Sequence, residues 1–306
     1  MPDVMDLEIA SVILKVRSSE RIIIHEPGVA YKPFMQSEGS ADTLQIILDL
    51  ELGEMPDTGG ENVTFNGQSW TMYADDSDYF FSSKSPAFKH PFWTAKAGRD
   101  FKKGTIYCSK EAILEKDDAV TVHNPLHYPL DQLLMMYILS QNRGAIIHAA
   151  GIEINGSGYI FPGRSGAGKS TLSRQFRGRM DASVLSDDRM VVRQIDNGYK
   201  AYGTPWPGDE GIAVNRGVPL AGIFFISHDK SNKIREMRPQ TAVERLLPVI
   251  SIPWYDTELT SKVLSFCDEL VTNIPAYELH CKPGIETADF LVESISRNRL
   301  ARKGGI

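Results

Sequence analysis

Residues 145–170 decide the fold, and they read AIIHAAGIEINGSGYIFPGRSGAGKS. The apolar run over 145–154 predicts a β-strand, and Asn155-Gly156 is the strongest short signal for a tight hairpin turn. Residues 158–162 then form the returning strand, which must be antiparallel to the first. A glycine-rich segment follows at once, so the second arm of a hairpin feeds the loop.

That segment, residues 163–170 (GRSGAGKS), matches the pattern G-x-x-x-x-G-K-[ST] and precedes a predicted helix over 169–177. Glycines let the backbone wrap a polyphosphate, and the loop N–H groups and the helix start face phosphate oxygens. Lys169 neutralises the β- and γ-phosphates, and the Ser170 hydroxyl binds Mg²⁺. The predicted nucleotide site is Gly163, Arg164, Ser165, Gly166, Ala167, Gly168, Lys169, Ser170 and Thr171.

A second cluster, Ser186-Asp187-Asp188-Arg189, lies between two short apolar runs, about 18 residues after Lys169. One of two adjacent carboxylates can hold Mg²⁺, while the other accepts a proton from an attacking hydroxyl. The alternative is a solvated acidic turn. The nearby phosphate-loop pattern favours the functional interpretation.

With these motifs, residues 145–227 resemble the catalytic domain of bacterial HPr kinase/phosphorylase, a family whose fold is similar to ATP-dependent phosphoenolpyruvate carboxykinase. The resemblance rests on the strand that carries His148, the hairpin into the loop and the Asp-Asp-Arg cluster; Gly203-Thr204-Pro205 and Arg216-Gly217 fit less specifically. It implies that Asp187 is the general base for a serine hydroxyl, Asp188 binds Mg²⁺, His148 lies near the transferred phosphate and Arg216 lines the acceptor side.

The chain also departs from this family. The bifunctional enzymes resemble G-D-S-G-x-G-K-S-E across the loop, whereas this chain has Arg164 in place of Asp and Thr171 in place of Glu. The Glu assists metal binding in those enzymes. Its replacement argues against a reverse phosphorylase reaction and against HPr itself as the substrate.

The fold class we expect is α/β (mixed α+β), with a β-rich N-terminal module at 1–124 and an HPr-kinase-like P-loop domain at 125–298, which has a mixed sheet and flanking helices. Strands are expected near 7–16, 21–25, 43–50, 63–65, 69–73, 104–109 and 119–123 of an antiparallel N-terminal sheet. Later strands are expected at 183–185, 190–195, 200–202 and 220–227. Helices are predicted over 130–141, 240–247, 257–273 and 285–296, with a frayed tail at 299–306. The stretch 75–100 carries no assignment.

Composition excludes several classes. The chain has 306 residues, of which 42% are hydrophobic and 24% charged, too apolar for a disordered protein. No apolar run reaches the roughly 20 residues that span a bilayer. A net charge of −6 argues against nucleic acid as a partner, and three dispersed cysteines favour a reducing cytoplasm.

The function expected from the sequence is an ATP- and Mg²⁺-dependent kinase that phosphorylates a hydroxyl of a protein, peptide or small molecule. Two alternatives are a nucleotide-binding module without transferase activity and a carboxykinase-like enzyme using Arg193, Arg216 or Arg235. The loop over 205–211, with Trp206 as an exposed-type aromatic, either contacts a substrate or packs as an ordinary loop. The acceptor, the nucleotide preference and assembly as a homo-oligomer are left open.

Overall fold

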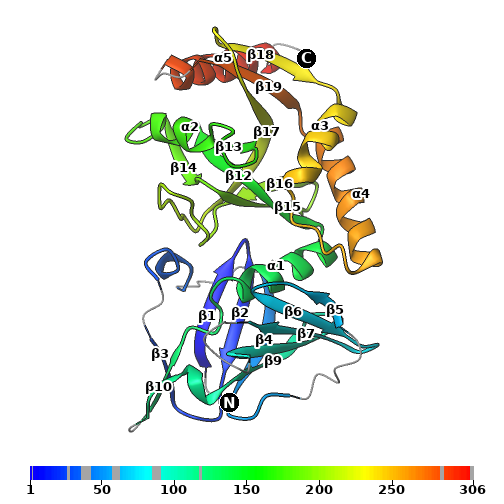
Figure 1. Cartoon of the computed structure of the whole chain (residues 1–306). Helices are drawn as coiled ribbons and strands as arrows, with labels where there is room; N and C mark the ends of the chain where they lie inside the picture. Colours follow the sequence, from blue (N-terminus) through cyan, green and yellow to red (C-terminus); the bar gives the residue numbers. More distant parts are fainter. Residues whose placement is uncertain are drawn as a thin grey trace. The chain divides into compact units, whose positions relative to one another are not determined.

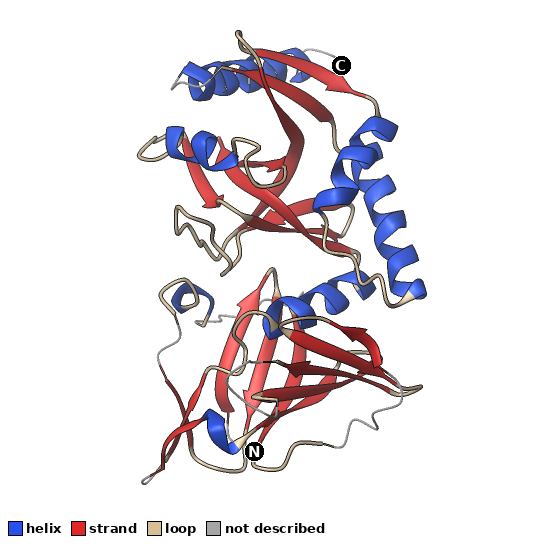
Figure 2. Cartoon of the chain, viewed as in Figure 1, coloured by secondary structure: helices blue, strands red, loops and turns tan. Residues whose placement is uncertain are grey.

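A computed structural model gives the protein a mixed α/β fold, as predicted (Figures 1 and 2). It describes residues 1, 3–25, 28–35, 43–56, 63–84, 91–116, 119–282 and 286–303. The chain divides into two compact units: an N-terminal unit of Met1–Ile138 with Trp254–Asp256, and a C-terminal unit of Leu139–Pro253 with Thr257–Ile306. The domain limits expected from the sequence, 1–124 and 125–298, stay a prediction.

The N-terminal unit is built on a sheet of eight strands in the order β1-β2-β4-β9-β8-β7-β6-β5. In chain order these are β1 (Asp3–Ile9), β2 (Val12–Arg17), β4 (Leu44–Leu52), β5 (Val63–Asn66), β6 (Trp70–Ala74), β7 (Asp78–Ser83), β8 (Trp93–Gly98) and β9 (Lys103–Cys108). The pairs β2–β4 and β4–β9 are parallel, so the sheet is mixed where the sequence analysis expected an antiparallel one. Parallel pairs need long connections, which the intervening segments provide.

A smaller sheet joins β10 (Ile113–Lys116), β11 (Val120–His123) and β3 (Ile22–His25). Single 3₁₀ turns lie at η1 (Lys32–Phe34) and η2 (Lys110–Ala112). The unassigned stretch 75–100 contributes β7 and β8 to the large sheet.

The predicted strand over 7–16 is instead a hairpin of β1 and β2. Ala10 and Ser11 form its turn with positive φ angles of 53° and 57°. The buried positions are 7 and 9 before the turn and 12, 14 and 16 after it. This one-residue change of phase in the apolar pattern is the mark of the turn, because side chains alternate strictly along one strand.

Helix α1 (Leu130–Gln141) begins and ends as predicted. Its Tyr137 is fully buried, with its ring centroid 5.0 Å from that of Tyr79 and 5.3 Å from that of Phe81. The Tyr137 hydroxyl donates to the sulfur of Met72 over 3.0 Å. These ring contacts fix the helix against the sheet, since buried aromatic pairs stabilise beyond their buried area.

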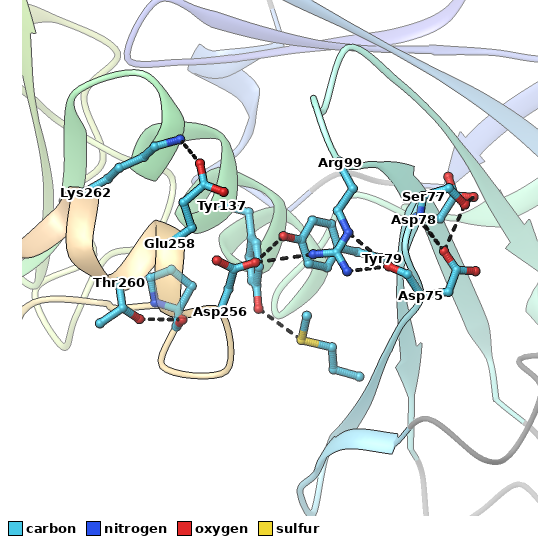
Figure 3. A network of polar contacts seen from close by, with 12 residues as sticks. Asp75, Ser77, Asp78, Tyr79, Arg99, Tyr137, Asp256, Glu258, Thr260 and Lys262 are labelled. Atoms are coloured by element: carbon cyan, nitrogen blue, oxygen red, sulfur yellow. Dashed lines mark hydrogen bonds and ion pairs between the residues drawn. The ribbon is translucent and has the colours of Figure 1, made fainter.

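Beside this helix, Asp256 ties its short segment to the N-terminal unit (Figure 3). The Tyr79 hydroxyl donates to Asp256 Oδ2 over 2.5 Å, and Arg99 Nη1 lies 3.4 Å from the same oxygen. The Arg99 guanidinium lies 4.1 Å from the centre of the Tyr79 ring. Burial raises the pKa of Tyr79 from 10.0 to about 12, and the Asp256 hydrogen bond adds to the shift.

We expect Tyr79→Phe to lower the free energy of unfolding by about 1–3 kcal/mol at pH 7, because it removes a donor to a carboxylate. Between pH 10.0 and about 12 the folded state keeps the phenol proton that the unfolded chain has lost. The stability from Tyr79 is therefore present below this window and lost as the pH rises through it. Denaturant unfolding at increasing pH should show that the difference in free energy of unfolding between wild type and Tyr79→Phe becomes smaller. Tyr73→Phe on β6 is the control. A difference that stays constant with pH would contradict this.

The C-terminal unit holds a second large sheet, in the order β13-β12-β15-β16-β17-β19-β18, with β14 paired to β12. Its strands are β12 (Gly144–Ile154), β13 (Ser157–Pro162), β14 (Ala182–Ser186), β15 (Arg189–Ile195), β16 (Gly198–Tyr202), β17 (Gly217–His228), β18 (Lys233–Met237) and β19 (Ala276–Cys281). Its helices are α2 (Lys169–Gln175), α3 (Pro239–Leu246), α4 (Thr257–Asn273) and α5 (Glu286–Lys303), with a 3₁₀ turn η3 (Leu247–Val249). Strands β18 and β19 have no counterpart among the predicted elements.

The predicted hairpin is confirmed. Strands β12 and β13 pair antiparallel, and Asn155 and Gly156 have φ angles of 49° and 75°, as a type I′ turn requires. Strand β13 also pairs in parallel with β17, from Gly158 to Ile160. The strand that feeds the glycine-rich loop thus lies between an antiparallel and a parallel neighbour.

Helices cover both faces of this sheet. One core cluster joins α3 and α4 to residues such as Ile147 of β12 and Phe225 of β17. The other joins α2 and α5 to Ile152 of β12 and Phe224 of β17. Each long strand is therefore buried on both sides, which explains its nearly continuous apolar sequence.

Helix α5 continues through Lys303, so the frayed tail expected from residue 299 is helical there, and residues 304–306 lie outside the described part. Residues 299–303 (RLARK) are strong helix formers, which accounts for the extension. In the described part of the chain, no helix combines the length and the apolar composition that crossing a membrane requires.

Candidate active site

The glycine-rich loop, residues 163–168, connects the end of β13 to the start of α2. Gly166 and Gly168 have φ angles of 82° and 95°, which residues with a side chain rarely adopt. The Gly163 N–H donates to the carbonyl of His148 over 3.1 Å and so ties the loop to β12. The two glycines and this bond fix the loop in a tight turn above the strand.

Lys169 is buried, although it carries an ammonium group. Its Nζ donates to the carbonyls of Gly163 at 2.9 Å and Arg164 at 3.3 Å, and it lies 3.0 Å from His148 Nε2. Burial lowers the pKa of Lys169, and the negative charge of Asp188 opposes this shift. The lysine thus sits under its own loop, held by two backbone carbonyl oxygens.

Asp188 forms the acidic partner of this group. Its Oδ1 lies 2.8 Å from His148 Nε2, and its Oδ2 lies 3.6 Å from Arg189 Nε. Burial alone would raise the pKa of Asp188, but the hydrogen bond and charge of His148, with the charges of Arg189 and Lys169, lower it overall. One ring nitrogen cannot donate to Asp188 and accept from Lys169 at once, so only one of these two contacts is a hydrogen bond for a given position of the ring proton.

Asp187 faces a different environment from Asp188. It is 1% exposed, and its carboxylate accepts three backbone N–H groups: Gly208 at 3.1 Å and Ile212 at 3.2 Å on Oδ1, and Glu210 at 2.9 Å on Oδ2. The sequence analysis made Asp187 the general base. In the structure its carboxylate anchors the loop over 207–212, which we call the wall loop, and the role as a base stays a prediction.

A second anchor holds the wall loop from the other side. The Glu210 side chain, 8% exposed, pairs with Arg174 Nε at 2.6 Å and Arg177 Nη2 at 3.1 Å, on and just after α2. Trp206, expected to be exposed, is buried at 5%. The segment before the wall loop therefore packs inward, while the wall loop itself is fixed between β14 and α2.

The loop, α2 and the wall loop enclose a polar pocket of about 520 Å³. It is lined by His148, Ser165, Gly166, Gly168, Lys169, Ser170, Thr171, Asp188, Gly208, Asp209 and His228. The structure thus gathers eight of the predicted site residues. Gly163, Arg164, Ala167, Asp187 and Arg216 are not part of this lining.

Arg216, predicted on the acceptor side, lies elsewhere in the unit. Its guanidinium contacts the carboxylate of Glu153 on β12 and the hydroxyl of Ser183 on β14. This pairing gives Arg216 a role in holding strands together, away from the pocket.

Three lining residues were not among the predicted site residues: Gly208, Asp209 and His228. Gly208 and Asp209 belong to the loop over 205–211, for which the sequence left a substrate contact open. Asp209 is exposed, and His228 ends the apolar strand β17. A polar residue at the end of a buried strand is the only local signal for His228. Gly208 is required because a Cβ there would lie 2.9 Å from Asp187 Oδ2.

The protein thus has a mixed α/β fold, in which a glycine-rich loop between a strand and a helix borders a polar pocket. The chain belongs to the family described as "SynChlorMet cassette protein ScmC", whose model matches residues 126–284, just over half of the 306 residues. No curated protein matches the sequence.

Among solved structures, the chain is similar to the Hpr(Ser) kinase/phosphatase from Coxiella burnetii, with 14% sequence identity and a TM-score of 0.32. The alignment covers 52% of this chain and 99% of that chain.

The two neighbouring carboxylates should respond differently to substitution. Asp187→Asn places an amide NH₂ against backbone donors and should lower the free energy of unfolding by about 2–3 kcal/mol. Asp188→Asn, in a part-exposed and solvent-screened pair, should change it by less than about 1 kcal/mol. Denaturant unfolding of both variants measures this, and equal losses would contradict the different environments described above.

Proposed function

We propose that this protein is a Mg²⁺-ATP-dependent phosphotransferase that moves the γ-phosphate to a hydroxyl of a protein, peptide or small molecule. The observation that carries the proposal is the convergence of Lys169, Ser170, His148 and Asp188 on one polar pocket beside the glycine-rich loop. A cation, a hydroxyl and a carboxylate around such a loop are the groups that phosphoryl transfer uses.

Lys169 supplies the positive charge. Its Nζ would leave the carbonyls of Gly163 and Arg164 for the β- and γ-phosphate oxygens, while the loop N–H groups face the same phosphates. A nucleotide that brings negative charge favours the ammonium form that burial disfavours. The buried lysine is thereby prepared for an anionic ligand.

The residues present also fit Mg²⁺. Ser170 and Asp188 supply oxygen ligands in the same pocket. The described residues hold no group of three or more His, Cys, Asp or Glu able to bind a metal, and Mg²⁺ commonly uses one or two carboxylates together with substrate phosphates. When bound, the ion would neutralise charge on the β- and γ-phosphates.

The acceptor's proton would go to the Asp188–His148 pair, which shares a hydrogen bond at the pocket. In the transfer, the hydroxyl O–H bond breaks, an O–P bond to the γ-phosphorus forms, and the bond to the β-phosphate oxygen breaks. Asp187 would act as a positioning residue through the wall loop. This gives Asp188 part of the role that the resemblance assigned to Asp187.

A second candidate is a nucleotide-binding module without transfer activity. The three backbone N–H groups on Asp187 favour it, because they remove the expected base from the pocket. The carboxykinase interpretation gains no support, since the described pocket lining contains no arginine for a dicarboxylate.

Calorimetric titration with Mg²⁺-ADP tests the first step. Lys169→Ala should weaken binding about tenfold or more, because it removes a buried charge from the phosphate site. Lys200→Ala, on the exposed side of β16, is the matched control and should bind as the wild type does. Binding that is equally strong in Lys169→Ala would refute the phosphate site.

ADP release from ATP, with water and serine-containing peptides as acceptors, tests transfer. Asp188→Asn should lower the rate by about a hundredfold or more, the usual loss for a missing acid–base group. A wild type that binds Mg²⁺-ATP but releases no ADP with any acceptor would support the regulatory module instead. An unchanged rate in Asp188→Asn would exclude Asp188 from the chemistry.

A further inference from the structure

A second, smaller cavity of about 90 Å³ adjoins the polar pocket. It is lined by Gly168, Thr171, Leu172, Gln175, Ile226, His228, Cys281, Lys282 and Thr287. Gly168, Thr171 and His228 line both cavities, whereas His148, Lys169 and Asp188 line only the first. The two cavities therefore adjoin along these three shared residues.

The junction lies at the last residue of the glycine-rich loop. A Cβ placed on Gly168 would be 3.5 Å from His228 Cε1 and 3.6 Å from Ile226 Cγ2. The end of β17 thus packs directly on the loop. Thr171 and His228, together with Gly168, form the boundary that the two cavities share.

The second cavity is mainly apolar, with a few ordered polar groups. Leu172 and Ile226 provide apolar walls. Gln175 Oε1 accepts the N–H of Ala288 over 3.2 Å, which fixes its amide and leaves the NH₂ end as a donor by chemistry. Thr287 Oγ1 donates to the Lys282 carbonyl over 3.0 Å and holds the floor in place. Apolar walls with few fixed polar groups are typical of sites for flat organic ligands.

The volume of the second cavity also suits a flat organic ligand. One water needs about 10–15 Å³ on this measure, so the cavity has room for about six to nine waters. Among the described lining residues, a second polyphosphate would find no buried lysine or arginine, since Lys282 pairs with Glu286 and its side chain is 44% exposed. A neutral ring suits the site better than an anion.

We propose that this second cavity binds the nucleobase of the nucleotide, with the phosphates in the polar pocket and the γ-phosphate at the Asp188 end. This rests on the proposed function and adds the direction in which the nucleotide lies. The lining supports it: His148, Lys169 and Asp188 line only the polar pocket, whereas Gly168, Thr171 and His228 line both cavities. In this orientation an acceptor hydroxyl would approach the γ-phosphate from the Asp188 end.

The test compares Mg²⁺-ADP with Mg²⁺-pyrophosphate, which lacks the base, by calorimetry on the full chain. We expect wild type to bind ADP about tenfold or more tightly than pyrophosphate, since burying a ring is worth a factor of this order. Ile226→Trp and Cys281→Leu fill the cavity and should weaken ADP binding about tenfold while leaving pyrophosphate within about twofold. Ile226→Val keeps the cavity open and is the control, expected to match wild type for both ligands.

Several outcomes overturn the proposal: equal wild-type affinity for the two ligands, filling variants with unchanged ADP affinity, or an equal loss for both ligands. Thermal unfolding verifies that each variant folds, and if one filling variant does not, the other decides. Failure of the proposed function gives a different result from failure of the nucleobase site. In that case either neither ADP nor pyrophosphate binds the wild type, or both bind and no phosphate is transferred from ATP. Pyrophosphate thus monitors the phosphate pocket independently of the second cavity.

Discussion

The candidate site depends on one constraint, the hydrogen bonds that Asp187 accepts in the two-residue bend between β14 and β15. Asp187 accepts three backbone N–H groups from the wall loop, while the neighbouring Asp188 contacts His148. A buried carboxylate needs such donors, and the wall loop needs an acceptor for N–H groups that its own turn does not satisfy. The carboxylate and the loop N–H groups therefore satisfy each other's hydrogen-bonding requirements.

Local sequence predicts the features whose cause is local. Asn155-Gly156 requires positive φ angles, and the structure has them; the pattern over 163–170 lies between a strand and a helix, as its glycines require. Helix α1 carries its own stop in Asn142-Arg143-Gly144. Where a few neighbouring residues determine the backbone conformation, the local sequence is sufficient to predict it.

The features that the sequence did not predict depend on pairing between segments that lie far apart in the chain. His228 reaches the pocket because β17 pairs with β13 and so ends beside the loop. Whether Asp187 or Asp188 faces the pocket depends on where the wall loop, over twenty residues later, supplies its N–H groups. The parallel pairs of the N-terminal sheet have the same origin. No periodicity in the sequence records which distant strand becomes a neighbour.

Helix α2 links the parts of the site into one mechanical unit. Its first residues, Lys169 to Thr171, line the polar pocket, and Leu172 and Gln175 line the second cavity. Arg174 holds Glu210 of the wall loop, while Gln175 is bonded to α5. A displacement of α2 would therefore change the phosphate loop, the pocket wall and the second cavity together. Because protein interiors are close-packed and transmit strain, we expect a ligand that shifts α2 from one cavity to change the other as well.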